Sequence, residues 1–98
     1  MESDLTGVGL IANERTRQIK SEGWSAQHDD QHVSGELAEA AVCYVKRRDA
    51  THSDGTPFGW PWDHKWWKPT MRIRNLVKAG ALIAAEIDRL LRVDTKGA

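Results

Sequence analysis

The sequence predicts an all-α fold: a small three-helix bundle in one domain, with a long loop rich in tryptophan and proline between the second and third helices. Three observations support this fold class. Apolar residues recur at helical spacing in three segments, residues that cap or end helices flank them, and no segment alternates apolar and polar residues as a strand does. The 98 residues suffice for one domain but not for two, and we expect residues 1–5 and 94–98 to be frayed ends.

The first two helices are expected over residues 6–22 and from Ser34 to about residue 48. Thr6 or Asp4 can cap the first helix and Gly23 can end it, while Ser34 can cap the second. The polar stretch 24–33 between them is expected to be a loop. The apolar stripes of the two helices are Val8, Ile11, Ala12 and Ile19 in the first and Leu37, Ala41, Tyr44 and Val45 in the second.

The third helix is expected from Pro69 or Thr70 to about Val93. Its apolar residues alternate spacings of three and four, the pattern by which long helices pair with one another. We call this row the aliphatic seam, and it comprises Ile73, Leu76, Gly80, Ile83, Ile87 and Leu90. The seam predicts a homo-oligomer, a dimer or a tetramer, that forms through helices.

The segment between the second and third helices holds most of the aromatic surface. Four of the five tryptophans lie within residues 59–69, where Gly59, Pro61 and Pro69 prevent a regular helix. Disordered segments are poor in aromatic residues, so we expect this loop to be ordered. Its indole rings either fill core that three helices cannot supply or stack on a nucleobase beside Lys65 and Lys68.

The overall composition limits the class of partner. Basic and acidic side chains balance at 14 each, so no overall field favours a DNA or RNA polymer or a membrane. Cys43 is the only cysteine, which excludes an intrachain disulfide and fits a reducing compartment. The first residues do not form a signal peptide, and no apolar run approaches the length of a membrane span. We therefore expect a cytoplasmic protein.

Two motifs offer ligands for a metal ion. Glu36 and Glu39 lie three residues apart, so both carboxylates would project from one side of a helix and could hold Mg²⁺. The alternative is a solvated helix face. In QHDDQH, His28, Asp30 and His32 are competent metal ligands, but the alternative is a loop whose side chains satisfy backbone groups.

A compact basic cluster stands at the start of the third helix. Arg74, Asn75 and Lys78 share a face by spacing, and Arg72 lies beside them. Cations at the N-terminal end of a helix oppose its macrodipole, so the cluster predicts an anionic ligand such as phosphate. The alternative is pairing with the chain's own carboxylates, namely Asp30, Glu36 or Glu39.

The chain resembles a family of short proteins common in phages and prophages of proteobacteria. The resemblance extends from about Ile11 to Leu91 and lies in NERTRQIKSEGW, HDDQHVSGELAEAAVCY and WPWDHKWWKPTMRIRNLVKAGALIAAEIDRL. It implies a phage protein that acts in the host cytoplasm. The helical layout is in turn similar to that of the MazG-like all-α nucleoside triphosphate pyrophosphohydrolases, which implies a MazG-like bundle.

The second resemblance also implies what the site lacks. In MazG-like enzymes a helix carrying ExxE faces a helix carrying ExxD, and together they hold magnesium against the phosphates of a nucleotide. Glu36 and Glu39 match the first motif. The second is missing, because cations stand where its acids are expected, and Glu86 and Asp88 are only two residues apart. The resemblance therefore implies a site that holds phosphate through fixed positive charge, without catalytic residues or a cofactor.

Three hypotheses follow. The favoured one is a non-catalytic protein that sequesters a nucleotide immune signal, of the cyclic oligonucleotide or cyclic ADP-ribose type, as an anti-defence sponge. The alternatives are a divergent metal-dependent nucleoside triphosphate pyrophosphohydrolase and a protein-interaction module that acts through the tryptophan loop. The residues expected to bind the ligand are Trp24, His28, Asp30, Trp60, Trp62, Trp66, Trp67, Lys68, Arg72, Arg74, Asn75 and Lys78, and those expected to bind a metal are Glu36 and Glu39.

Overall fold

The structure is a computed structural model that describes residues 6–46 and 51–97. The all-α prediction is confirmed, since these ranges contain helices and no strand. None of the described helices combines the length and the apolar content that crossing a membrane requires. The elements are α1 (Gly7–Ser21), α2 (Ala26–Asp29), α3 (Glu36–Val45), the short 3-10 helix η2 (His64–Trp66) and α4 (Arg72–Gly97).

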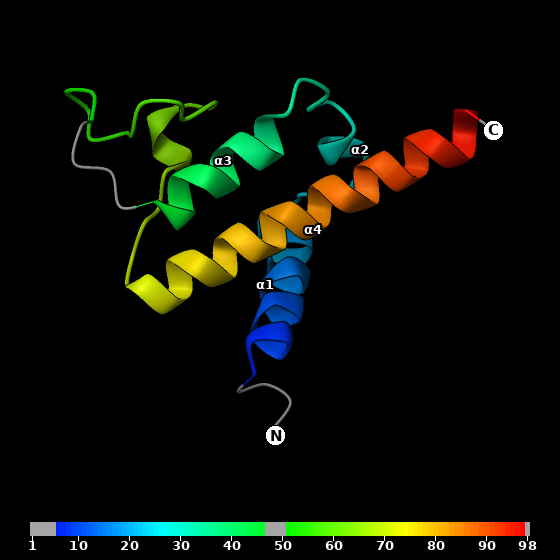
Figure 1. The fold of residues 1–98 in the computed structure, drawn as a ribbon, viewed down its shortest axis with the longest axis horizontal. Helices are drawn as coiled ribbons and strands as arrows, with labels where there is room; N and C mark the ends of the chain where they lie inside the picture. The colour runs from blue at the N-terminus through cyan, green and yellow to red at the C-terminus, as the bar shows by residue number, and fades with distance from the viewer. Residues whose placement is uncertain (1–5, 47–50, 98) are drawn as a thin grey trace.

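Helix α4 is the element on which the others pack. Helix α3 runs alongside it in the opposite direction, whereas α1 crosses it steeply (Figure 1). Small residues on both α3 and α4 let their backbones approach closely. The core between them consists of Leu37, Ala40, Ala41 and Tyr44 from α3 and Ala79, Leu82 and Ala85 from α4. Most of the stripe predicted for the second helix is therefore confirmed, but Val45 is exposed.

The predicted ends of the first helix are confirmed, but its predicted apolar face is not the buried one. The Thr6 hydroxyl accepts a hydrogen bond from the Gly9 N–H at 3.0 Å and caps α1. Helix α1 buries the polar residues Glu14 and Gln18, while Val8 is 81% exposed. The reason is that α4 supplies Arg74 as a partner for Glu14, so the polar side of α1 gains more from facing α4.

The second helix begins differently from the prediction. Its N-cap is Gly35, whose φ of 85° favours glycine, and not Ser34. Ser34 instead donates its backbone N–H to the Glu36 carboxylate at 2.7 Å. The segment predicted to be a plain loop, 24–33, contains α2, which the Ser25 hydroxyl caps. Helix α3 ends at Val45, and residues 47–50 lie outside the described part of the chain.

The third predicted helix is longer at its C-terminal end than expected. Helix α4 begins at Arg72 and continues through residues 94–97, which the sequence suggested would fray, while residues 1–5 and Ala98 are not described. The loop before it is folded. An isolated antiparallel bridge joins Thr51 to Pro57, and three of the tryptophans that follow, Trp60, Trp62 and Trp67, pack against the core.

Candidate functional site

The tryptophans of the loop fall into two groups. Trp60 and Trp67 surround Tyr44, with ring centroids 5.7 and 4.6 Å from the tyrosine ring. Both also pack against the core between α3 and α4, as do Trp24 and Trp62. The Tyr44 hydroxyl accepts the backbone N–H of Lys68 at 3.1 Å. These two rings, both predicted to bind a ligand, therefore anchor the loop to the bundle.

The other group forms an aromatic hollow. Trp24, Trp62 and Trp66 line a space of about 160 Å³ together with His28 and His32. Trp24 stacks on His28 with ring planes 2° apart, and the His32 ring lies 5.1 Å from that of Trp62. Residues from the segment after α1, from α2 and from the loop before α4 thus converge on one space. Three of the predicted tryptophans and His28 lie together here.

Two features set the chemistry of the aromatic hollow. The indole Nε1 of Trp62 is buried and has no acceptor among the described residues. Burial lowers the pKa of His32, and the neighbouring His28 lowers it further, while Glu36 opposes the shift. The His32 ring on the wall of this hollow is therefore neutral at neutral pH.

A second, charged hollow shares a wall with the first. Trp24 and Trp66 line both spaces, and the second has a volume of about 30 Å³, room for little more than a water molecule. Its buried Gln18 has a side-chain oxygen without a donor among the described residues. The charged groups that line it are Glu14, Arg17, Glu22, Lys68 and Lys78.

Positive charge lies beside Trp66, one of the two tryptophans that line both hollows. The ammonium groups of Lys65 and Lys68 lie 5.6 and 5.5 Å from the centroid of the Trp66 ring. Lys68 also lies 3.5 Å from the Glu22 carboxylate. Lys78 donates to the Lys68 carbonyl at 2.5 Å, and burial lowers its pKa. A ligand bound in the aromatic hollow and extending past Trp66 would come close to the exposed Lys65 and Lys68.

The basic cluster predicted at the start of α4 is divided in the structure. Arg74 points to Glu14 and lies 2.6 Å from its carboxylate. Arg72 donates instead to the backbone carbonyl of Val45, and Asn75 exchanges hydrogen bonds with Thr70. Arg72 and Asn75 line a separate space near Pro57 and Trp67. Of the predicted cluster, only Lys78 lines the charged hollow.

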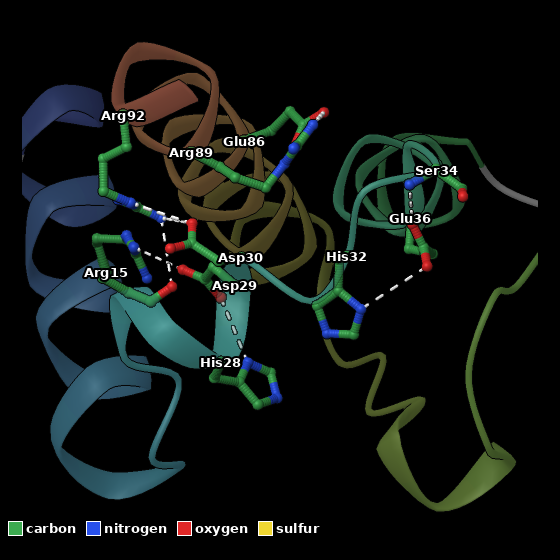
Figure 2. A network of polar contacts seen from close by, with 11 residues as sticks. Arg15, His28, Asp29, Asp30, His32, Ser34, Glu36, Glu86, Arg89 and Arg92 are labelled. Carbon is green, nitrogen blue, oxygen red and sulfur yellow. Dashed lines mark hydrogen bonds and ion pairs between the residues drawn. The ribbon is translucent and has the colours of Figure 1, made fainter. Parts of the chain in front are cut away.

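The two aspartates after α1, Asp29 and Asp30, form ion pairs with arginines of neighbouring helices. Figure 2 shows Arg15 of α1 and Arg92 of α4 reaching toward Asp29 and Asp30. Asp29 is fully buried and lies 2.9 Å from Arg15, while Asp30 lies 2.7 Å from Arg92. These pairs tie α2 to its two neighbours. Asp30, predicted to contact a ligand, is thus engaged with Arg92.

The two predicted metal ligands gain no third partner. Glu36 accepts a hydrogen bond from Ser34 and lies 3.9 Å from the nearer ring nitrogen of His32, whereas Glu39 is exposed (Figure 2). Within residues 6–46 and 51–97, no three His, Cys, Asp or Glu side chains gather closely enough to hold a metal ion. The metal site remains a prediction.

Several residues of the two hollows were not among the predicted ligands. The sequence predicts His32 only as a metal ligand, and Glu14 and Arg17 lie outside the apolar stripe predicted for the first helix. The spacing of Glu14, Arg17 and Gln18 did carry a signal, because side chains three and four apart on a helix can bond. The sequence could not show that α4 would cover this face.

Comparisons with known proteins give no independent indication of function. No protein-family model matches the chain, and searches of curated proteins and of solved structures found no match either.

Proposed function

We propose that the chain binds a nucleotide without turning it over, with the base in the aromatic hollow and the phosphates on the neighbouring lysines. The observation that carries this proposal is the arrangement of the two hollows around Trp24 and Trp66. Both tryptophans line the aromatic hollow and the charged hollow, and the ammonium groups of Lys65 and Lys68 lie beside the Trp66 ring. Bases stack on indoles and phosphates pair with ammonium groups, so the arrangement suits both halves of a nucleotide.

The size of the aromatic hollow supports a division between base and phosphate. Sites that enclose a whole drug-sized ligand measure roughly 300–1,000 Å³. A space of about 160 Å³ suits a single ring system, so the sugar and phosphates would lie outside it. The buried Trp62 N–H has no acceptor among the described residues, so a shift of the ring that brought it to a carbonyl or ring nitrogen of the base would remove the cost of leaving it unpaired.

The proposed biological role is that of a phage-encoded sponge. Its ligand would be a nucleotide immune signal of the cyclic oligonucleotide or cyclic ADP-ribose type. This role needs tight binding and no hydrolysis. The phage origin rests on the sequence resemblance alone.

The direct test is titration calorimetry with cyclic dinucleotides, cyclic trinucleotides, cyclic ADP-ribose, ATP, adenosine and inorganic phosphate. We expect a dissociation constant below about 1 µM for one cyclic nucleotide, with much weaker binding of adenosine and of phosphate alone. If no nucleotide in this panel binds below the micromolar range, the proposal is wrong.

Variants separate stacking from general effects on the fold. Trp66 is not among the tryptophans that pack against the core, so the chain should still fold when Trp66 is replaced by alanine. Because base stacking contributes about 1–3 kcal/mol, this variant should weaken binding about 5- to 150-fold. Phe58→Ala is the matched control, since Phe58 is an exposed aromatic ring outside both hollows and its loss should leave affinity unchanged.

The two alternative functions give different outcomes in the same preparation. Release of pyrophosphate from nucleoside triphosphates with Mg²⁺ or Mn²⁺, abolished in Glu36→Ala, would establish the pyrophosphohydrolase instead. A host protein that copurifies in stoichiometric amount, with no bound nucleotide, would favour the interaction module. The ultraviolet spectrum and mass of any small molecule released on denaturation distinguish these outcomes from the proposed one.

A further inference from the structure

The aliphatic seam of α4 is an exposed apolar surface, which Ile11 of α1 covers at Gly80. The core between α3 and α4 uses Ala79, Leu82 and Ala85, and Val77 and Ala81 are also buried; all five lie on other sides of the helix. The five aliphatic side chains of the seam remain between 41% and 67% exposed, and they are Ile73, Leu76, Ile83, Ile87 and Leu90. Single exposed aliphatic residues are ordinary on a protein surface, but a continuous row of five marks an interaction surface.

We propose that this seam is the interface at which two copies of the chain pair, in an isologous dimer whose long helices pack against each other. The spacing of the row supports a helix as the occupant. Side chains alternating three and four residues apart form a straight ridge on one helix, and a matching ridge on a second helix fits into its gaps. From Ile73 to Leu90 the ridge is about 26 Å long.

The centre of the seam shows how α1 joins the same surface. A Cβ atom placed on Gly80 would lie 2.5 Å from the Cδ1 atom of Ile11, so the Ile11 side chain occupies the position of the missing one. Val8, three residues before Ile11 on α1, is among the most exposed aliphatic residues. The apolar surface of α4 therefore continues onto α1, and a second copy would cover both.

The chain exposes more surface than a compact monomer of its mass, as expected of a subunit that a partner covers. A compact monomer of 11.0 kDa exposes about 5,600 Å². This chain exposes 6413 Å². Standard interfaces bury about 800 Å² from each partner. A small domain also gains more from association than a large one, because it buries less of its own surface.

The charges near the seam favour a second copy over a lipid surface. Helices that lie on membranes carry Lys and Arg on their polar face. The exposed charges next to this seam are mixed, with Arg72 at one end and Asp88 and Asp94 toward the other. The arginines of the C-terminal half of α4 are already paired, Arg89 with Glu86 and Arg92 with Asp30. The seam therefore lacks the row of unpaired cations that holds a helix on anionic lipid.

The test is the molar mass in solution, measured by light scattering and by sedimentation between about 1 and 100 µM chain, the concentration range in which ordinary dimers form and dissociate. We expect the wild-type chain to approach twice 11.0 kDa as its concentration rises. Ile87→Asp should remain at the mass of one chain. Val42→Asp is the matched control, because Val42 is exposed to a similar extent on α3 and should still dimerise.

A second measurement guards against a variant that fails to fold. The melting temperature of a wild-type dimer rises with protein concentration, because association stabilises the folded state by mass action. Ile87→Ala, which adds no charge, should raise the dimer dissociation constant by more than about tenfold. A wild-type mass of one chain at every concentration, with a constant melting temperature, would overturn the proposal. So would equal loss of dimer in Val42→Asp and Ile87→Asp.

Discussion

The carboxylate of Glu14 in α1 lies 2.6 Å from a guanidinium nitrogen of Arg74 in α4, sixty residues away in the sequence. Glu14 is only 1% exposed, and Arg17 donates two hydrogen bonds to the same carboxylate, at 2.8 and 2.9 Å. Gln18 adds a fourth hydrogen bond at 3.2 Å. An acidic side chain thus forms the centre of the contact between α1 and α4, beside the charged hollow.

The first prediction concerns the stability that Glu14 provides. Glu14→Gln keeps the shape of the side chain but removes its charge, so the hydrogen bonds from the two arginines weaken. We expect unfolding in urea to require about 1–3 kcal/mol less, because a hydrogen bond to a charged partner contributes about that much. Glu39→Gln, an exposed acid on α3, should stay within about 0.5 kcal/mol of wild type.

The same carboxylate predicts a dependence on acid. Burial alone would raise the pKa of Glu14, but hydrogen bonds from Arg17, Arg74 and Gln18 outweigh it and lower the pKa below 4.5. A lowered pKa gives stability that is present above pH 4.5 and is lost as the pH falls toward the folded-state value. Wild type should therefore lose more stability than Glu14→Gln between pH 5 and pH 3. Equal losses would show that Glu14 is not ionised in the folded chain.

The second prediction tests the crossing of α1 over Gly80. Alanine favours a helix over glycine by about 1 kcal/mol, but its methyl group would meet Ile11 Cγ1 at 2.7 Å. Overpacking of this kind costs about 1–3 kcal/mol, so Gly80→Ala should lower the unfolding free energy by about 1 kcal/mol in all.

The companion variant reverses this sign. In an Ile11→Ala background the obstructing side chain is gone, so adding Gly80→Ala should raise stability by up to about 1 kcal/mol. Urea unfolding of the four chains at one protein concentration completes the cycle. If Gly80→Ala has the same effect in both backgrounds, Ile11 and Gly80 do not meet as described.

The third prediction follows from His32 in the aromatic hollow. Burial lowers the pKa of His32 below 6.5, so the folded chain prefers the neutral ring. The resulting stability is present above pH 6.5 and is lost as the pH falls below it. His32→Gln should therefore lose less stability than wild type between pH 7 and pH 5. Between pH 7.5 and 8.5, where the ring is neutral in both states, the difference between the two chains should stay constant.

The fourth prediction separates two adjacent tryptophans. Trp67 packs on Tyr44 and on the core, whereas Trp66 lies against Trp24 and two lysines. Trp67→Ala should lower the unfolding free energy by about 3 kcal/mol, as expected when a large ring leaves a cavity. Trp66→Ala should cost less than about 1 kcal/mol. Thermal or urea unfolding of the two variants side by side measures the contrast, and equal costs would contradict the division into anchor and hollow.

Local sequence signals accounted for most of the secondary structure. Thr6, Gly23 and the alternating spacing of the third helix predict elements that the structure contains. They succeed because caps, stops and helical periodicity depend on residues within one or two turns of each other. The short helix α2 escaped notice, because a single turn has too few residues to show a period.

The sequence predicted only part of the arrangement of the candidate site. The chemistry of the tryptophans, His28, Lys68 and Lys78 predicts binding residues, but no sequence signal distinguishes Trp60 and Trp67, which pack on Tyr44, from Trp62 and Trp66, which line the aromatic hollow. That division depends on which rings reach Tyr44 when the loop folds back on α3.

The sequence by itself determined the helices, the aromatic loop and the aliphatic seam. Only the tertiary structure decided that α1 turns Glu14 and Gln18 inward, that the basic cluster around Arg74 divides, and that the seam stays outside the core. The physical reason is that the sequence of a helix does not by itself decide which of its faces is buried. A charged face is buried when another element supplies opposite charge and hydrogen bonds, and an apolar face stays exposed until a partner covers it.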